Sequence, residues 1–187
     1  DMQQGERIGI YGNVAGTYSI SGVAVSGMSV GAWLDGEGTG TVSRTWIGAM
    51  TSINGAHIDG LTRRSGTGSL VVTGTRIDAT GPFATGALFL QNTWDGPIGG
   101  IELKDTLLEG DGYVLTLENT GAGTSVSLDN VRLRSTGWGP LQAAGNITIL
   151  TWWHVTSSGR LLLPPSPAGQ AAAWCTAAPE RPRTCRT

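Results

Sequence analysis

The chain has 187 residues, a formal net charge of −2 and a sequence pI of about 5.6. This charge balance gives no global positive field, so no nucleic-acid partner is expected. No apolar run approaches the roughly 18 residues that span a bilayer, so no membrane segment is expected either. Glycine supplies 30 residues and charged side chains only 14% of the chain. This composition is typical of one domain made of many short strands joined by tight turns.

A nine-residue pattern recurs in six segments of the chain. Its order is apolar, any, apolar, polar, turn residue, small or apolar, any, apolar, any. The segments are Tyr18–Ser26, Thr51–Asp59, Leu70–Asp78, Ile101–Glu109, Val126–Arg134 and Ile147–Val155. Alternation on both sides of the fifth position predicts two strands, each with one buried face, that meet at a bend. The third positions predict one buried column, made of Ile20, Ile53, Val72, Leu103, Leu128 and Ile149.

The bend position predicts a left-handed backbone, because most of its residues tolerate that conformation. It is occupied by Gly22, Gly55, Gly74, Asp105, Asn130 and Thr151. A third strand is predicted by four apolar pairs, Ala32/Leu34, Leu88/Leu90, Leu115/Leu117 and Leu141/Ala143. Two residues after each pair comes a second turn column of Gly36, Asn92, Asn119 and Gly145, in which the two asparagines are expected to stack as a short ladder.

Three strands in a regular repeat indicate a solenoid. The pattern resembles the pectin-lyase-like superfamily of right-handed parallel β-helices, which includes polysaccharide lyases and hydrolases, epimerases and phage tailspikes. The resemblance covers roughly residues 5–163 and implies an all-β, right-handed parallel β-helix of about six short coils. The polygalacturonase signatures Asn-Thr-Asp, Asp-Asp and Gly-His-Gly are absent. An antiparallel β-sandwich is the alternative fold, since short alternating strands with glycine turns suit it as well.

The predicted organisation is a β-helix over residues 1–165 and a Pro/Ala-rich C-terminal tail over residues 166–187. The register is least defined between Gly36 and Ser69. There Gly40–Gly48 also fits the pattern, but it begins only 11 residues before Thr51. No capping element precedes Ile8, so the amino-terminal edge is expected to stack on an upstream domain or on another subunit, as in a homotrimer.

The two cysteines, Cys175 and Cys185, flank nine residues of the tail and predict a disulfide, which favours an extracellular location. Two idle thiols are the alternative. No second pair of Cys or His stands nearby, so no metal site is expected, and no cofactor is expected.

Outward positions seven and nine of the pattern should form two columns on one sheet, with about 4.8 Å between strands. The columns are Ala24, His57, Arg76, Leu107, Arg132, Trp153 and Ser26, Asp59, Asp78, Glu109, Arg134, Val155. Asp59 and Asp78 are then neighbours roughly 5 Å apart, the carboxylate separation of retaining glycosidases. Together with Glu109 they are the candidate catalytic residues.

His57, Arg76 and Arg132 of the same columns are candidates to bind an acidic sugar. The alternative is a solvated ladder of salt bridges that only stabilises the sheet surface.

Tryptophans give a second signal. Trp46, Trp94 with Asp95, and Trp138 are expected in exposed loops, where flat rings beside polar groups suit sugars. The alternative is that these rings cover the edges of the solenoid. The sequence thus predicts a polysaccharide-recognising domain of an extracellular or virion-associated protein. A polysaccharide lyase or glycoside hydrolase that uses the surface carboxylates is the first alternative, and a structural spacer or trimerisation segment is the second.

Overall fold

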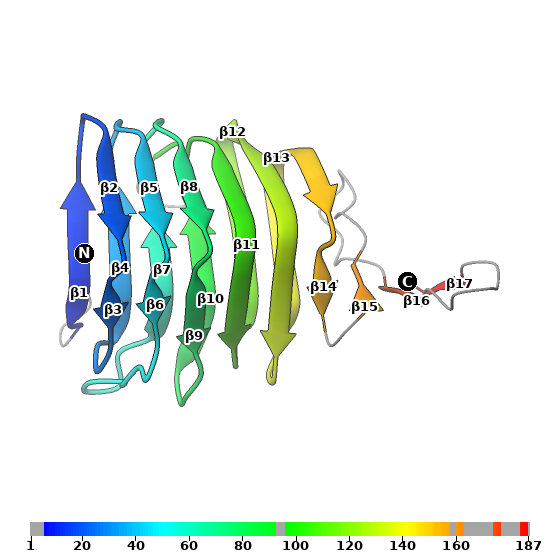
Figure 1. Cartoon of the computed structure of the whole chain (residues 1–187), viewed down its shortest axis with the longest axis horizontal. Coiled ribbons are helices and arrows are strands. Elements are labelled where there is room, and N and C mark those ends of the chain that lie inside the picture. Colours follow the sequence, from blue (N-terminus) through cyan, green and yellow to red (C-terminus); the bar gives the residue numbers. More distant parts are fainter. Residues whose placement is uncertain (1–5, 93–95, 158–159, 163–173, 177–183, 187) are drawn as a thin grey trace.

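The computed structural model describes residues 6–92, 96–157, 160–162, 174–176 and 184–186. The chain is a parallel β-solenoid of about six turns, which confirms the predicted fold class. Successive coils follow one another along the long axis, from the blue amino-terminal strand to the coils near residue 160 (Figure 1). In the part of the chain that the structure describes, no helix is long and apolar enough to span a membrane.

Each coil contributes one strand to each of three faces. Face A contains β2 (Tyr18–Ser21), β5 (Gly40–Ser43), β8 (Leu70–Thr73), the first half of β11 (Ile101–Gly110), the middle of β12 (Tyr113–Ser135) and the second half of β13 (Gly139–Trp153). Face B contains β3 (Ala24–Val25), β6 (Trp46–Ile47), β9 (Arg76–Ala79), the second half of β11, the end of β12 and β14 (Thr156–Ser157). Face C contains β1 (Ile8–Asn13), β4 (Val30–Asp35), β7 (Ile58–Arg63), β10 (Ala84–Gln91) and the first parts of β12 and β13. The strand pairs within these faces are parallel.

Inward side chains of equivalent positions stack into one continuous core. Ile20, Val42, Val72, Leu103 and Leu128 stand in register along face A. Apart from Ile20, which lies in the first coil, these side chains are at most 1% exposed. Burial of one apolar column by the next coil is therefore the main stabilising interaction of the fold.

The predicted register was wrong between Gly36 and Ser69. Gly40–Gly48, and not Thr51–Asp59, forms the second coil, because β5 pairs with both β2 and β8. The segment that contains Ile53 is instead a connection between β6 and β7. Its Asn54 and Gly55 have φ values of 53° and 77°, and the Ala56 N–H donates to the Ile53 carbonyl. Asn-Gly is a strong turn signal, so this part of the sequence leaves the sheet.

The last coil is also shifted from the predicted register. Ile149 pairs with Val126, and Leu128 pairs with Trp152. An extra residue in β13 at this point, the 66% exposed Leu150, accounts for the shift.

The bend between faces A and B is a column of left-handed residues. The column is made of Gly22, Arg44, Gly74, Asp105, Asn130 and His154, with φ between 48° and 66°. Four of the predicted members are confirmed. Arg44 and His154 replace Gly55 and Thr151 because of the two register changes.

The third strand was predicted correctly, since Leu88, Leu115 and Leu141 stand in register on face C with Leu61, which the sequence pattern missed. The Asn92 amide donates to the Asn119 carbonyl oxygen, so the asparagine ladder is also confirmed.

Arg63 is a buried cation inside the solenoid, fully shielded from solvent. Its Nη2 donates to the carbonyls of Gly36, Gly66 and Gly68 at 2.7–3.0 Å. Burial lowers the pKa of this guanidinium. Arg63 thus ties together two turns at the corner between faces C and A, a role that sequence periodicity did not indicate.

The two ends of the solenoid differ. β1 pairs only with β4 among the described strands, so the amino-terminal edge is open and its predicted stacking partner stays a prediction. At the other end β15 (Arg160–Leu161) pairs antiparallel with β14. In the tail, β16 (Trp174–Thr176) and β17 (Thr184–Arg186) form a separate antiparallel pair with Cys175 opposite Cys185. The predicted domain boundary at residue 165 lies outside the described residues.

Candidate functional site

Face B gathers most of the predicted site residues. Its first outward column is Ala24, Trp46, Arg76, Leu107, Arg132 and Thr156, in that order along the solenoid. In the second column, Glu109 is in register with Asp78 on one side and with Arg134 on the other. Trp46 therefore takes the place predicted for His57.

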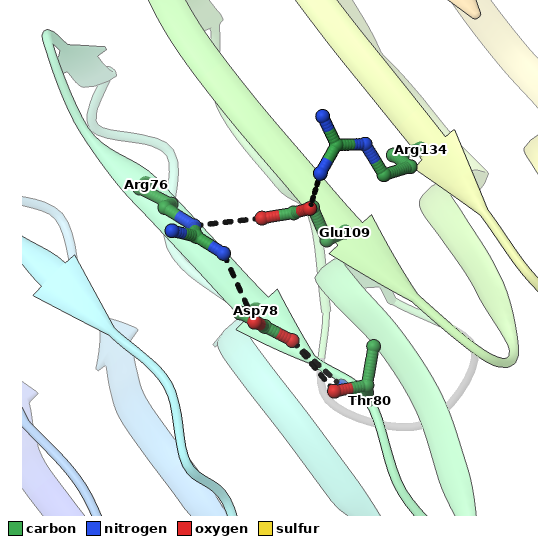
Figure 2. Close-up of polar contacts among 5 residues, drawn as sticks. All are labelled: Arg76, Asp78, Thr80, Glu109 and Arg134. Atoms are coloured by element: carbon green, nitrogen blue, oxygen red, sulfur yellow. Dashed lines mark hydrogen bonds and ion pairs between the residues drawn. The ribbon is translucent and has the colours of Figure 1, made fainter. Parts of the chain in front are cut away.

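A network of ion pairs connects three neighbouring strands of this face (Figure 2). Arg76 Nε donates to Glu109 Oε2 at 2.7 Å, and Arg134 Nη1 donates to the other oxygen, Oε1. Arg76 Nη2 also lies 3.4 Å from Asp78 Oδ2, and Asp78 Oδ1 accepts from the hydroxyl and the N–H of Thr80. Arg76 thus bridges both carboxylates.

Burial is uneven within the network. The Glu109 side chain is 7% exposed, whereas those of Arg76 and Arg134 are 50% and 64% exposed. Arg132 is exposed as well and has no ion-pair partner among the described residues. The carboxylate is covered, and the cations are what face B presents to solvent.

Trp46 provides an aromatic surface on the strand next to that of Arg76. Its indole lies over Gly48, where an added Cβ would come within 2.7 Å of the ring. The residue remains 37% exposed, and it pairs across the strands with Arg76. An exposed ring, on a residue in register with Arg76, is therefore built into the sheet itself rather than into a loop, contrary to the prediction.

Asp78 and Glu109 are the carboxylates that lie on adjacent strands, with the usual interstrand spacing of about 4.8 Å. Each of them forms an ion pair with Arg76. The predicted proximity of Asp59 and Asp78 is wrong, because Asp59 belongs to β7 on face C, between Val30 and Gly86.

Asp59 is 2% exposed and its Oδ1 has no hydrogen-bond partner. Burial raises the pKa of this carboxyl to about 7. The nearby Arg64 cation and the Thr62 hydroxyl lower the pKa, and the Glu6 carboxylate raises it further. A carboxyl enclosed in this way cannot contact a polysaccharide, so Asp59 is not part of a surface site.

Of the remaining predicted residues, His57 and Trp138 lie outside the strands of face B. His57 is exposed in the connection that precedes β7. Trp138 is 70% exposed at the corner between faces B and C, and its ring packs edge-to-face on Tyr113. Trp94 and Asp95 lie outside the described residues.

Face A offers a contrast in its first three coils. Its outward residues there are Ser19, Ser21, Thr41, Ser43, Val71 and Thr73, which carry neither charge nor an aromatic ring. Further along, face A also exposes Glu102, Lys104 and Trp153, but the described residues of this face form no ion pair. The connected ion pairs, with Trp46 on the next strand, make face B the candidate site.

Within the described residues, no group of three or more His, Cys, Asp or Glu side chains is placed to hold a metal ion. No protein-family model matches the chain, and neither a curated protein nor a solved structure matches it. The structure therefore shows a parallel β-solenoid, membership of the pectin-lyase-like superfamily stays a prediction, and the candidate site rests on the geometry of this chain.

Proposed function

We propose that face B binds a polysaccharide, as part of an extracellular or virion-surface protein with a β-helix of the pectin-lyase-like kind. The observation that carries this proposal is the exposed ring of Trp46, in register with Arg76 and next to the ion-pair network. Aromatic rings stack on the apolar faces of sugars, and guanidinium groups donate paired hydrogen bonds to hydroxyls or carboxylates. Rigid strands hold these groups at fixed spacing.

Binding fits this geometry better than cleavage does. Hydrolysis of a glycosidic bond requires one carboxyl to donate a proton and another to act as nucleophile or base. Glu109 is held by two arginines, and Asp78 by Arg76 and Thr80. Both carboxylates are therefore paired and hold arginine side chains in place. This arrangement suits a binding surface.

The test is a panel of alginate, polygalacturonate, xylan and cellulose, in which both binding and new chain ends are followed. The chain should bind at least one of them without producing new ends. Trp46→Ala should weaken this binding about tenfold, or ~1.4 kcal/mol, through loss of the stacked ring. Tyr11→Ala is the matched control, because Tyr11 is a 62% exposed aromatic residue on face C.

Two results would contradict the proposal. One is equal affinity of the Trp46→Ala and Tyr11→Ala variants. The other is release of new chain ends that stops in Glu109→Gln, which would make face B an active site.

The extracellular location depends on the predicted disulfide. Cys175 and Cys185 are directly opposite each other in an antiparallel pair. Cα atoms of such pairs are about 4.5–5.5 Å apart, within the range that a disulfide spans. The intact mass without reductant should be about 2 Da below the reduced mass, because formation of a disulfide removes two hydrogen atoms. Two free thiols after expression in an oxidising compartment would remove this support.

A further inference from the structure

The corner between faces B and C carries two exposed aromatic residues. Phe83 is 61% exposed in the turn before β10, and Trp138 is 70% exposed in the turn before β13. Both turns connect a strand of face B to the next strand of face C. The corner therefore continues the surface that holds the ion-pair network.

Phe83 has an unfavourable backbone conformation. Its φ is 68°, in the left-handed region that bulky side chains rarely adopt. The ring is largely in solvent, so its burial does little to offset the strain. Such strain persists where the surrounding structure imposes it, and it is often found at binding sites.

Asp111 holds the two aromatic turns at a fixed distance from each other. Its Oδ2 accepts from the Gly81 N–H at 2.7 Å, and its Oδ1 accepts from the Thr136 hydroxyl. The Trp138 N–H donates to the Asp111 carbonyl. Three successive turns are thus joined through one residue, and Phe83 and Trp138 are two coils apart, roughly 10 Å at the usual strand spacing.

We propose that Phe83 and Trp138 extend the face B site over this corner and contact a second part of the same polysaccharide chain. The proposal rests on the proposed function of face B. Thr80 links the two regions, because its hydroxyl donates to Asp78 in the network while the next residue, Gly81, donates to Asp111. Two rings held two coils apart fit a linear chain of several sugars better than a single sugar, and they make the site selective for length.

Phe83→Gly tests this inference because it separates strain from function. Glycine adopts positive φ without a steric penalty, so the variant should have a melting temperature about 2–4 °C higher. It should also bind long oligosaccharides about threefold to tenfold more weakly, through loss of one ring contact. Phe83→Tyr keeps the ring and should retain the affinity.

The probes are size-fractionated oligosaccharides of alginate, polygalacturonate and xylan, short and long, with the full chain. The gain in affinity from short to long oligosaccharides should disappear in Phe83→Gly and in Trp138→Ala, whereas binding of short ones should not change. A lower melting temperature with unchanged affinity would assign Phe83 a purely structural role and overturn the proposal. If Trp46→Ala leaves the binding of short oligosaccharides intact, the function proposed for face B fails instead.

Discussion

Glu109 on face B and Asp59 on face C are both buried acidic residues, 5% and 2% exposed as whole residues, yet their surroundings are opposite. Each Glu109 oxygen accepts from an arginine on a neighbouring strand, whereas Asp59 Oδ1 has no partner. Burial alone disfavours an ionised carboxylate, and pairing with cations offsets that cost. The partners on adjacent coils therefore decide what a buried acid does in this solenoid.

The difference follows from the residues in register. Glu109 has Asp78 and Arg134 beside it, and Arg76 lies two residues before Asp78. Asp59 has Val30 and Gly86 beside it, and Arg64, the cation whose charge lowers the pKa of Asp59, stacks over the Trp33 ring at 4.3 Å. Face B assembles a charged surface, whereas face C encloses a carboxyl that takes up a proton near neutral pH.

Both carboxyl groups are held in place by strands that pack on the same core. Truncation of a core side chain should therefore have the largest effect on the free energy of unfolding. Leu103→Ala should lower the free energy of unfolding by about 2–5 kcal/mol, because it opens a cavity in a fully buried column. Chemical denaturation measures this effect. Leu150→Ala, at a 66% exposed position, should change it by less than about 0.5 kcal/mol. Equal losses in the two variants would contradict the assigned core.

Asp59 should make stability depend on pH. Its folded-state pKa of about 7 lies above the ordinary value of 3.8, so the folded chain holds a proton that the unfolded chain releases. The contribution of Asp59 to the free energy of unfolding should therefore be fully present below about pH 4 and should fall by up to about 4 kcal/mol as the pH rises through 7.

Asp59→Asn should remove this slope, because the amide keeps the shape without the charge. Urea denaturation between pH 4 and pH 8 measures it, with Asp78→Asn as the control that retains the slope. If the slope survives in Asp59→Asn, another group titrates and the contrast with Glu109 is lost.

Glu109→Gln should destabilise the fold modestly. The variant leaves Arg76 and Arg134 without their shared carboxylate, and hydrogen bonds to charged groups contribute about 1.5–3 kcal/mol. Both arginine side chains are at least half exposed, so solvent screening reduces the expected loss to about 1 kcal/mol. Denaturation of the two proteins side by side measures it. A variant more stable than the parent would show that burying Glu109 costs more than its pairing returns.

Arg134→Gln should have the smallest effect. This side chain is 64% exposed and makes one contact with Glu109. The expected loss is below about 1 kcal/mol and should shrink further in 1 M salt, which screens exposed charges. Arg76→Gln should cost more than Arg134→Gln, since Arg76 contacts two carboxylates. The reverse order would mean that Arg76 does not organise the network.

Part of the site could be predicted from sequence and part could not. Arg76, Asp78, Glu109 and Arg132 fall on one face as expected, because strand alternation places every second residue outward wherever the register is correct. Asp59 and His57 were assigned to the same face through the segment at Thr51, which satisfies the pattern as well as Gly40–Gly48 does. Trp46 was consequently assigned to a loop.

What the sequence determined by itself was the architecture: alternation gave the inward columns, permissive residues gave the bend, and paired leucines gave the third strand. These features are local, since they depend on residues two to nine positions apart. Only the tertiary structure decided which of two neighbouring segments, Gly40–Gly48 or Thr51–Asp59, forms the second coil, because that choice depends on pairing with β2 and β8 from other coils. The tertiary structure also decided three arrangements: Trp46 in register with Arg76, the burial of Asp59, and the three turns joined through Asp111. Each of them depends on residues that are neighbours only across the coils.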